Sequence, residues 1–510
     1  MSADVLFVNA NVITMNPGQP RAHFVATNGD CILMAGEDKD LSSFTGPRTR
    51  TVDCRGKTVV PGFIDAHCHV FSMIRKLLSV DLSYASVSSI SDIREAISHH
   101  SRTVPAGTWI TGTDYHEFYL EERRHPTRWD LDDIAGESPV LLIHQSRHAC
   151  VLNSKGLALA GIHREKEEPP GALIDRDLST GEPNGVLFGM LDYITQEVLP
   201  RPEGEEMDRG TSQANHYYLS RGITSLHDAS VSNDPDRWKT FRRFKEMGRL
   251  KSRISMMPGI DFISEFRSAG ITPGSGDKHL RLGGTKIILS EATGRLQPSQ
   301  QELNALVAMA SAAGFQVAIH AIEQSCVEAA ITALENVQHS NHRHRIEHCS
   351  ECAPELLNRL ARVNPVIVTQ PPFIYYNGDR YLATIPYSKM PWLYPLASLL
   401  KTGLLVAGSS DSPVVDANPL VGIHAAVNRL SDRGDPLHPE ERVSPFDVLA
   451  MYTINTAYAS FEEKIKGSLA PGKLADMAVL SSDPLTSPPE QLKDIKVEMT
   501  VIGGEIVWES

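Results

Sequence analysis

The segment GFIDAHCHV (residues 62–70) is a short apolar run that ends in two histidines, His67 and His69. Residues two apart in a β-strand point to the same face, so both imidazoles could reach one metal ion. Apolar runs that end in polar residues recur along the chain, and their spacing predicts the fold.

Eight apolar, β-branched runs are separated by stretches of helical pattern. The runs are residues 59–65, 222–228, 253–259, 285–290, 315–320, 344–348, 366–370 and 404–411. From the second run onward they start about 20 to 40 residues apart, the length of one strand–helix unit. This alternation is typical of a parallel sheet. Eight such units predict an α/β fold, a TIM (β/α)8 barrel with its active site at the C-terminal ends of the strands.

The two ends of the chain differ from the middle, because both read as short strands joined by turn residues. We therefore expect a small β-sandwich domain formed by residues 1–58 and 467–510, beside a barrel spanning residues 59–466. The interval between the first two barrel runs is too long for one helix. It predicts an inserted subdomain at about residues 80–210.

Composition narrows the class of protein. The 510 residues are 41% hydrophobic and 22% charged, as in an ordinary globular protein. A formal net charge of −13 argues against non-specific binding to nucleic acid or to an anionic membrane. The N-terminus lacks signal-peptide features, no apolar stretch is long enough to span a membrane, and the seven cysteines show no disulfide-framework spacing. We expect a reduced, cytoplasmic enzyme with a small-molecule substrate.

Residues of metal-ligand type end four of the barrel runs. They are His67 and His69 on the first run, His320 on the fifth, His348 on the sixth and Asp411 on the eighth. A barrel brings these strand ends together, so the sequence predicts a metal centre. Imidazoles with one carboxylate suit zinc, and less distinctively iron, nickel or manganese.

Several motifs carry a resemblance to a known family. PGFIDAHCH (61–69), RIEH (345–348), SSDSP (409–413) and GSLAPGKLADMAVL (467–480) together resemble the amidohydrolase superfamily. WITGTDY (109–115) and GITSLHDA (222–229) resemble its YtcJ-like branch, which includes N-substituted formamide deformylases. The resemblance extends over nearly the whole chain.

The resemblance implies a centre with two divalent metals. His67, His69 and Asp411 would bind one metal, and His320 and His348 the second. Lys286, on the fourth run, would be carbamylated and bridge them, unless it is an ordinary lysine at a strand end. The implied enzyme is a metal-dependent amidohydrolase that cleaves an N-acyl or N-formyl C–N bond of a small molecule. Its nucleophile would be a metal-activated hydroxide, with Asp411 as general acid and base; Asp411 could also cap a helix.

Two departures from the branch leave alternatives open. HAIEQ (320–324) places Glu323 three residues after His320, an arrangement that resembles mononuclear deaminases acting on amino-substituted heterocycles. In that case His67, His69, His320 and Asp411 would hold a single metal, and Glu323 and His348 would transfer protons. The other departure is SEATGR (290–295), in which Glu291 is a candidate for lining the pocket. A metal-free scaffold on the same fold is a further, less favoured alternative.

Two residues outside the barrel runs are also candidates for substrate binding. His148 and Tyr115 lie in the expected insert, where each could instead be a packed structural side chain. Cys349 and Cys352 form an isolated C-x-x-C pair to which we assign no function. The frequent dimers of the family leave a homodimer open.

Overall fold

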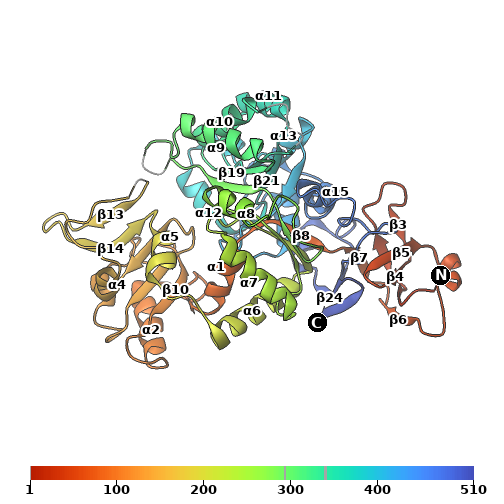
Figure 1. Ribbon diagram of the computed structural model, residues 1–510, viewed down its shortest axis with the longest axis horizontal. Helices are drawn as coiled ribbons and strands as arrows, with labels where there is room; N and C mark the ends of the chain where they lie inside the picture. Colours follow the sequence, from red (N-terminus) through yellow and green to blue (C-terminus); the bar gives the residue numbers. More distant parts are fainter. Residues whose placement is uncertain (1, 170, 292–293, 338–341) are drawn as a thin grey trace. The chain divides into compact units, whose positions relative to one another are not determined.

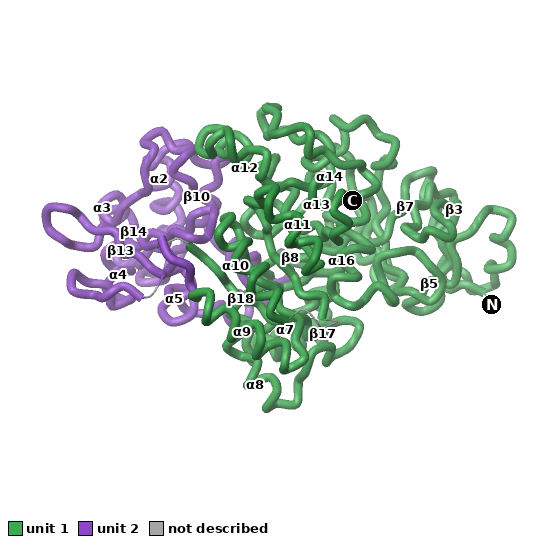
Figure 2. The backbone as a smooth tube through the Cα atoms, turned by 90° about the horizontal axis from the view of Figure 1, so that it is seen from above, with its two compact units in different colours: residues 1–70, 214–291, 298–510 green, residues 71–213, 292–297 purple. Residues whose placement is uncertain are grey.

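The computed structural model describes residues 2–169, 171–291, 294–337 and 342–510. The chain forms two compact units, shown in Figure 2. The first unit contains residues 1–70, 214–291 and 298–510, and the second contains residues 71–213 and 292–297. Among the described residues, no helix combines the length and the apolar character needed to cross a membrane.

Parallel strands form the centre of the first unit (Figure 1). They occur in two sheets, with the orders β17-β16-β15-β8 and β18-β19-β20-β21-β22. The strands are β8 (Phe63–Cys68), β15 (Ile223–Asp228), β16 (Arg253–Met256), β17 (Leu280–Leu282), β18 (Thr285–Ile288), β19 (Val317–Ala321), β20 (Arg345–His348), β21 (Val366–Thr369) and β22 (Val406–Gly408). Parallel bridges between Gly259 and Lys286, and between Cys68 and Ser412, join the two sheets. The result is a TIM-barrel-like α/β fold.

Gly259 lies at one of these junctions. A Cβ at this position would overlap the carbonyl oxygen of Val231, so a glycine permits the close approach of these two segments. Next to it, the Lys286 N–H donates to the Pro258 carbonyl at 2.8 Å, and this hydrogen bond holds β18 beside the chain that follows β16.

Helices connect and follow the parallel strands. They are α7 (Pro235–Glu246), α8 (Ile263–Ser268), α9 (Gln300–Ala312), α10 (Gln324–Glu335), α11 (Pro354–Val363), α12 (Pro372–Thr384), α13 (Leu396–Lys401), α14 (Pro419–Asn428), α15 (Pro445–Met451) and α16 (Ile454–Ala459). Local sequence sets some of their ends. Ser299 and Glu302 form a capping box at the start of α9, and Asn364 adopts a left-handed conformation after α11.

Strands from the two ends of the chain pair with one another in the first unit. One sheet has the order β5-β4-β1-β6, and the other β25-β24-β23-β7-β2-β3. The strands are β1 (Val5–Val8), β2 (Asn11–Ile13), β3 (Arg21–Ala22), β4 (Phe24–Asn28), β5 (Cys31–Gly36), β6 (Arg50–Asp53), β7 (Thr58–Pro61), β23 (Met477–Leu480), β24 (Val497–Ile502) and β25 (Glu505–Glu509). Buried apolar side chains from both termini share one core. The expected boundaries of a separate β domain remain a prediction.

The second unit contains a mixed sheet with the order β13-β14-β12-β11-β10-β9. Its strands are β9 (Val80–Asp81), β10 (Ile110–Tyr115), β11 (Val140–His144), β12 (Ala149–Leu152), β13 (Leu173–Arg176) and β14 (Pro183–Phe188). Its helices include α2 (Ile90–Ser101), α3 (Arg128–Leu131), α4 (Ser154–Leu159) and α5 (Leu191–Tyr193). In the chain, α1 (Val70–Leu77) precedes this sheet and α6 (Gly204–Leu219) follows it. β9, β10 and β11 run parallel, whereas β12 is antiparallel to β11.

Candidate metal centre

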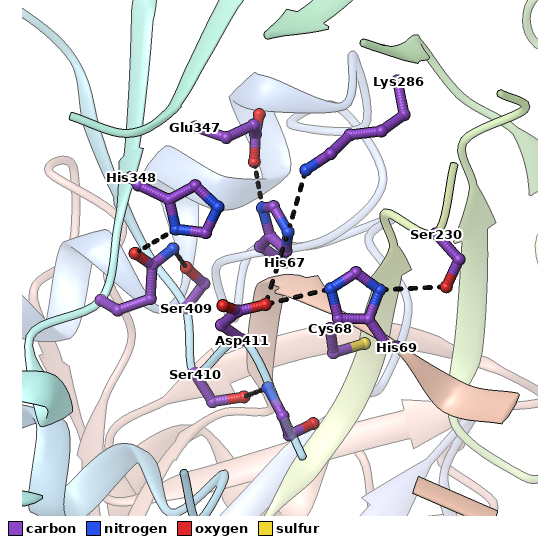
Figure 3. Close-up of polar contacts among 12 residues, drawn as sticks. His67, Cys68, His69, Ser230, Lys286, Glu347, His348, Ser409, Ser410 and Asp411 are labelled. Carbon is purple, nitrogen blue, oxygen red and sulfur yellow. Dashed lines mark hydrogen bonds and ion pairs between the residues drawn. The ribbon is translucent and has the colours of Figure 1, made fainter. Parts of the chain in front are cut away.

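The predicted ligand residues lie on or just after the parallel strands. Figure 3 shows His67, His69, Lys286, His348 and Asp411 with their polar side-chain atoms turned toward one another. His67 lies near the end of β8 and His69 just after it; Lys286, His320 and His348 lie on β18, β19 and β20, and Asp411 follows β22. Strand register helps to bring them together, since Ile288 pairs with His320 and Ala321 with His348.

His67, His69 and Asp411 form the tightest group. Asp411 Oδ1 lies 3.0 Å from His69 Nε2 and 3.6 Å from His67 Nε2, and the ligand atoms of the three residues all lie within 4.8 Å of one another. The Asp411 N–H donates to the His67 carbonyl at 2.8 Å, and its φ of 57° is left-handed. The expected helix does not start at Asp411: the next one, α14, begins at Pro419 with Asn418 as its N-cap.

His348 and His320 lie beside this group. Their ring centroids are 4.4 Å apart, and those of His348 and His67 are 4.8 Å apart. His348 Nε2 is buried and has no hydrogen-bond partner among the described residues. Leaving such a nitrogen unpaired is costly, and a bound metal would satisfy it. The set of imidazole and carboxylate donors, together with this unpaired nitrogen, fits a divalent metal.

Lys286 belongs to the same cluster. Its side chain is only 1% exposed, and its Nζ lies 3.1 Å from His67 Nε2. Burial lowers the pKa of Lys286 to about 8, because a charged ammonium is poorly solvated there. Near neutral pH a larger fraction of this amine is therefore uncharged than in an exposed lysine, and the uncharged amine is the form that can react with CO2.

Three residues that the sequence analysis did not single out hold the imidazoles in place. Glu347 Oε2 accepts from His67 Nδ1 at 2.5 Å, and Ser230 Oγ lies 3.0 Å from His69 Nδ1. Gln370 Oε1 accepts from His348 Nδ1 at 2.8 Å. In each histidine Nδ1 is engaged, which leaves Nε2 for a metal, and such partners orient metal-binding histidines.

Buried charges support this arrangement. The Arg345 guanidinium binds both oxygens of Glu347, at 2.6 and 2.9 Å. Burial lowers the pKa of His67 well below its usual value, as does the nearby Lys286, so this imidazole is neutral as a ligand must be. Burial opposes ionisation of Asp411, but the hydrogen bond from His69 and the surrounding imidazoles hold the pKa of Asp411 well below its usual range.

Asp65 anchors the segment that carries Asp411. Its carboxyl group accepts from the Ser410 hydroxyl at 2.5 Å and from the Ser410 N–H at 3.1 Å. Burial raises the pKa of Asp65 to about 7 in spite of these hydrogen bonds. The role of Asp65 follows from its contacts: it fixes the backbone immediately before Asp411.

The acidic candidates Glu323 and Glu291 lie at the start of α10. Glu323 is the residue that precedes this helix, and Glu291 accepts a hydrogen bond from Ser325 in its first turn. Burial raises the pKa of the Cys326 thiol to about 12, and the negative charges of both carboxylates raise it as well. Ala292 and Thr293, in the same segment as Glu291, lie outside the described residues.

Tyr115 and His148 belong to the second unit. Tyr115 is fully buried, and its hydroxyl lies 3.0 Å from His125 Nδ1. His148 is exposed, on the turn between β11 and β12. That these residues bind substrate remains a prediction.

Comparison with known proteins identifies the family. Residues 50–508 match the amidohydrolase family. The chain belongs to the amidohydrolase family. It is 30% identical to an N-substituted formamide deformylase of Arthrobacter pascens, over 99% of this chain and 98% of the relative. It is 29% identical to the putative amidohydrolase YtcJ of Bacillus subtilis strain 168, over 98% of both chains.

A solved structure shares the fold. An uncharacterized metal-dependent hydrolase from Pyrococcus horikoshii OT3 superposes with a TM-score of 0.77 at 23% identity, covering 95% of this chain and 99% of the other. These findings confirm the predicted YtcJ-like amidohydrolase. The protein is a hydrolase that acts on carbon–nitrogen bonds.

Proposed function

We propose that this amidohydrolase cleaves the C–N bond of an N-acyl or N-formyl amide of a small molecule, at a centre of two divalent metals bridged by carbamylated Lys286. The position of Lys286 carries the proposal. Its Nζ is buried 3.1 Å from His67 Nε2, in the same cluster as five residues of ligand type. An uncompensated ammonium beside two cations would be repelled, whereas a carbamate is an anion with two oxygens.

The chain's own residues divide between the two metals. His67, His69 and Asp411 would bind one of them, and His320 and His348 the other. Zinc suits these donors. When bound, the metals lower the pKa of a water molecule towards about 7 and polarise the substrate carbonyl.

Asp411 is the general base and acid in this proposal. Its low pKa keeps the carboxylate ionised, and it lies beside His67 and His69, where a water bound at the centre would be within its reach. Asp411 takes a proton from the attacking water as the C–O bond forms. It returns the proton to the leaving nitrogen as the C–N bond breaks. The products are a carboxylic acid, which is formate for an N-formyl substrate, and an amine.

The relatives support this substrate class. One of them, similar along its whole length, is named an N-substituted formamide deformylase. The rival is a mononuclear deaminase that depends on Glu323. It gives no role to Lys286, although this lysine contacts a predicted ligand.

A substrate panel tests the proposal. Metal-loaded protein would be incubated with N-formyl amines, N-acyl amines and amino-substituted heterocycles, with separate detection of carboxylic acid, amine and ammonia. We expect equal amounts of acid and amine from an amide. Ammonia from the heterocycles, with no amide cleaved, would overturn the proposal in favour of the deaminase.

A further inference from the structure

A second cluster of metal-binding residues lies in the second unit, at the carboxyl edge of two parallel strands. β10 and β11 are neighbours, with Tyr115 paired to His144. His116 and Glu117 directly follow β10, and His144 is the last residue of β11. Parallel strands therefore bring metal-binding side chains together at their C-terminal ends here too, as they do in the first unit.

The side chains meet at one carboxylate oxygen. Glu117 Oε2 lies 2.7 Å from His144 Nε2 and 3.2 Å from His116 Nδ1. The His116 and His144 ring centroids are 4.3 Å apart, and the three possible ligand atoms all lie within 4.8 Å of one another. His125 Nδ1 is the next neighbour, at 3.9 Å from the same oxygen.

Both imidazoles turn a nitrogen toward the same carboxylate oxygen. His116 Nδ1 lies 3.2 Å from Glu117 Oε2 and 3.2 Å from the Phe118 backbone nitrogen, and His144 Nε2 lies 2.7 Å from the same oxygen. Without a metal, a proton on an imidazole nitrogen can bridge it to the carboxylate. A divalent cation can take the place of that proton, because metal binding requires deprotonated ligands, and the two nitrogens and the oxygen then become its ligands.

The surroundings suit metal binding. Ser146 contacts the other side of the His144 ring: its N–H donates to Nδ1 at 3.1 Å and its Oγ lies 2.7 Å from the same nitrogen, which fixes the ring with Nε2 facing Glu117. His116 is 8% exposed and His144 6%, whereas the Glu117 side chain is 31% exposed, so an ion could enter from the Glu117 side.

We infer that His116, Glu117 and His144 form a second divalent-metal site, separate from the hydrolytic centre. Two imidazoles and one carboxylate are a donor set that zinc accepts, with a fourth position open to water or a further ligand. The bound metal would tie the end of β10 to the end of β11. Nothing in this inference depends on the proposed substrate or on the number of metals at the hydrolytic centre.

Metal content of matched variants tests the inference. Full-length protein would be stripped with chelator, dialysed against limiting zinc, and analysed for zinc atoms per chain. Glu117→Gln and His144→Gln each remove a ligand while keeping a side chain of similar size. Glu165→Gln is the control, because Glu165 pairs with His163 at 3.3 Å in an exposed position of the same unit.

We expect Glu117→Gln and His144→Gln to bind one zinc fewer per chain than the wild type, and Glu165→Gln to bind as many. Zinc should also raise the unfolding temperature of Glu117→Gln less than that of the wild type. Equal zinc content in wild type and both cluster variants would overturn the inference, as would an equal loss in Glu165→Gln. If His144→Gln fails to fold, His116→Gln takes its place under the same criteria.

Discussion

The buried carboxylate of Glu347 accepts a hydrogen bond from His67 Nδ1 at 2.5 Å, and this contact directs His67 Nε2 into the metal centre. Glu347 is in turn held by both arms of the Arg345 guanidinium. The charge of one buried arginine is thus linked through Glu347 to a predicted ligand on a different strand. We therefore expect this contact to contribute both to metal affinity and to the stability of the fold.

Glu347→Gln should weaken both properties. The amide cannot neutralise Arg345, and an unpaired buried charge costs about 3–5 kcal/mol of unfolding free energy. Metal affinity should fall by about 10–100-fold, because His67 loses the carboxylate that orients it. Chelator competition and denaturant unfolding measure the two effects. Glu335→Gln, at a part-exposed pair with Arg359, is the control and should cost no more than about 1 kcal/mol. A Glu347→Gln variant as stable as Glu335→Gln would contradict the role of Glu347 in neutralising Arg345.

Lys286→Ala should lose the bridging carbamate. We expect kcat to fall by about 100-fold or more, on the scale of removing a preorganised electrostatic group. A short carboxylate such as acetate, entering the space left by the side chain, should restore part of the activity. Wild-type protein supplied with ¹³C-bicarbonate should show a carbamate carbon resonance that the variant lacks. Finding the same resonance in the variant, or full activity without acetate, would rule out the bridge.

Asp411→Asn and Glu323→Gln distinguish the two proton-transfer schemes. Asp411→Asn should reduce kcat by about 10²–10⁴-fold, the usual contribution of a general acid or base. Glu323→Gln should keep most of the activity, since Glu323 has no role in the proposed reaction. Steady-state kinetics on one amide substrate measures both variants. The deaminase scheme predicts a large loss of activity in both variants, because Asp411 is a metal ligand and Glu323 transfers protons in that scheme.

His344 should make the fold less stable in acid. Burial, with a smaller contribution from His342, lowers the pKa of His344 to about 4, below the value of about 6.5 in an unfolded chain. Between these values the unfolded chain binds a proton that the folded chain does not. Unfolding free energy therefore falls as pH falls, by about 1.4 kcal/mol per pH unit from this group. His344→Gln should flatten that slope in denaturant titrations from pH 6.5 to about 4. His163→Gln, at an exposed histidine, is the control. Equal slopes of unfolding free energy against pH in the two variants would refute the attribution of the slope to His344.

The sequence predicted the barrel strands well because buried parallel strands are continuous apolar runs. Each of the eight predicted runs overlaps a strand of the two parallel sheets, although the first run straddles β7 and β8. The clustering of the predicted ligand residues could be predicted from the same pattern, because the C-terminal ends of parallel strands meet at one edge of the sheet. The prediction that Asp411 caps a helix was wrong, because its left-handed backbone turns the chain back toward His67.

What the sequence analysis missed depends on contacts between distant strands. Glu347 and Gln370 ended or nearly ended predicted runs, yet nothing in a single run shows that their partners are His67 and His348. Arg345 and Glu347 lie two residues apart and so on one face of a buried strand, which was an available signal of a buried ion pair. His116 and His144 escaped notice because the insert had not been divided into strands.

A centre of two metals should be evident from the activity of protein loaded with increasing amounts of metal. Protein stripped of metal would be titrated with zinc while hydrolysis of one N-formyl or N-acyl amide is followed. The Glu117→Gln variant would be used, so that the second cluster takes up no metal. We predict negligible activity without metal and a plateau at two equivalents per chain. Full activity at one equivalent, or activity in the stripped protein, would rule out the two-metal centre.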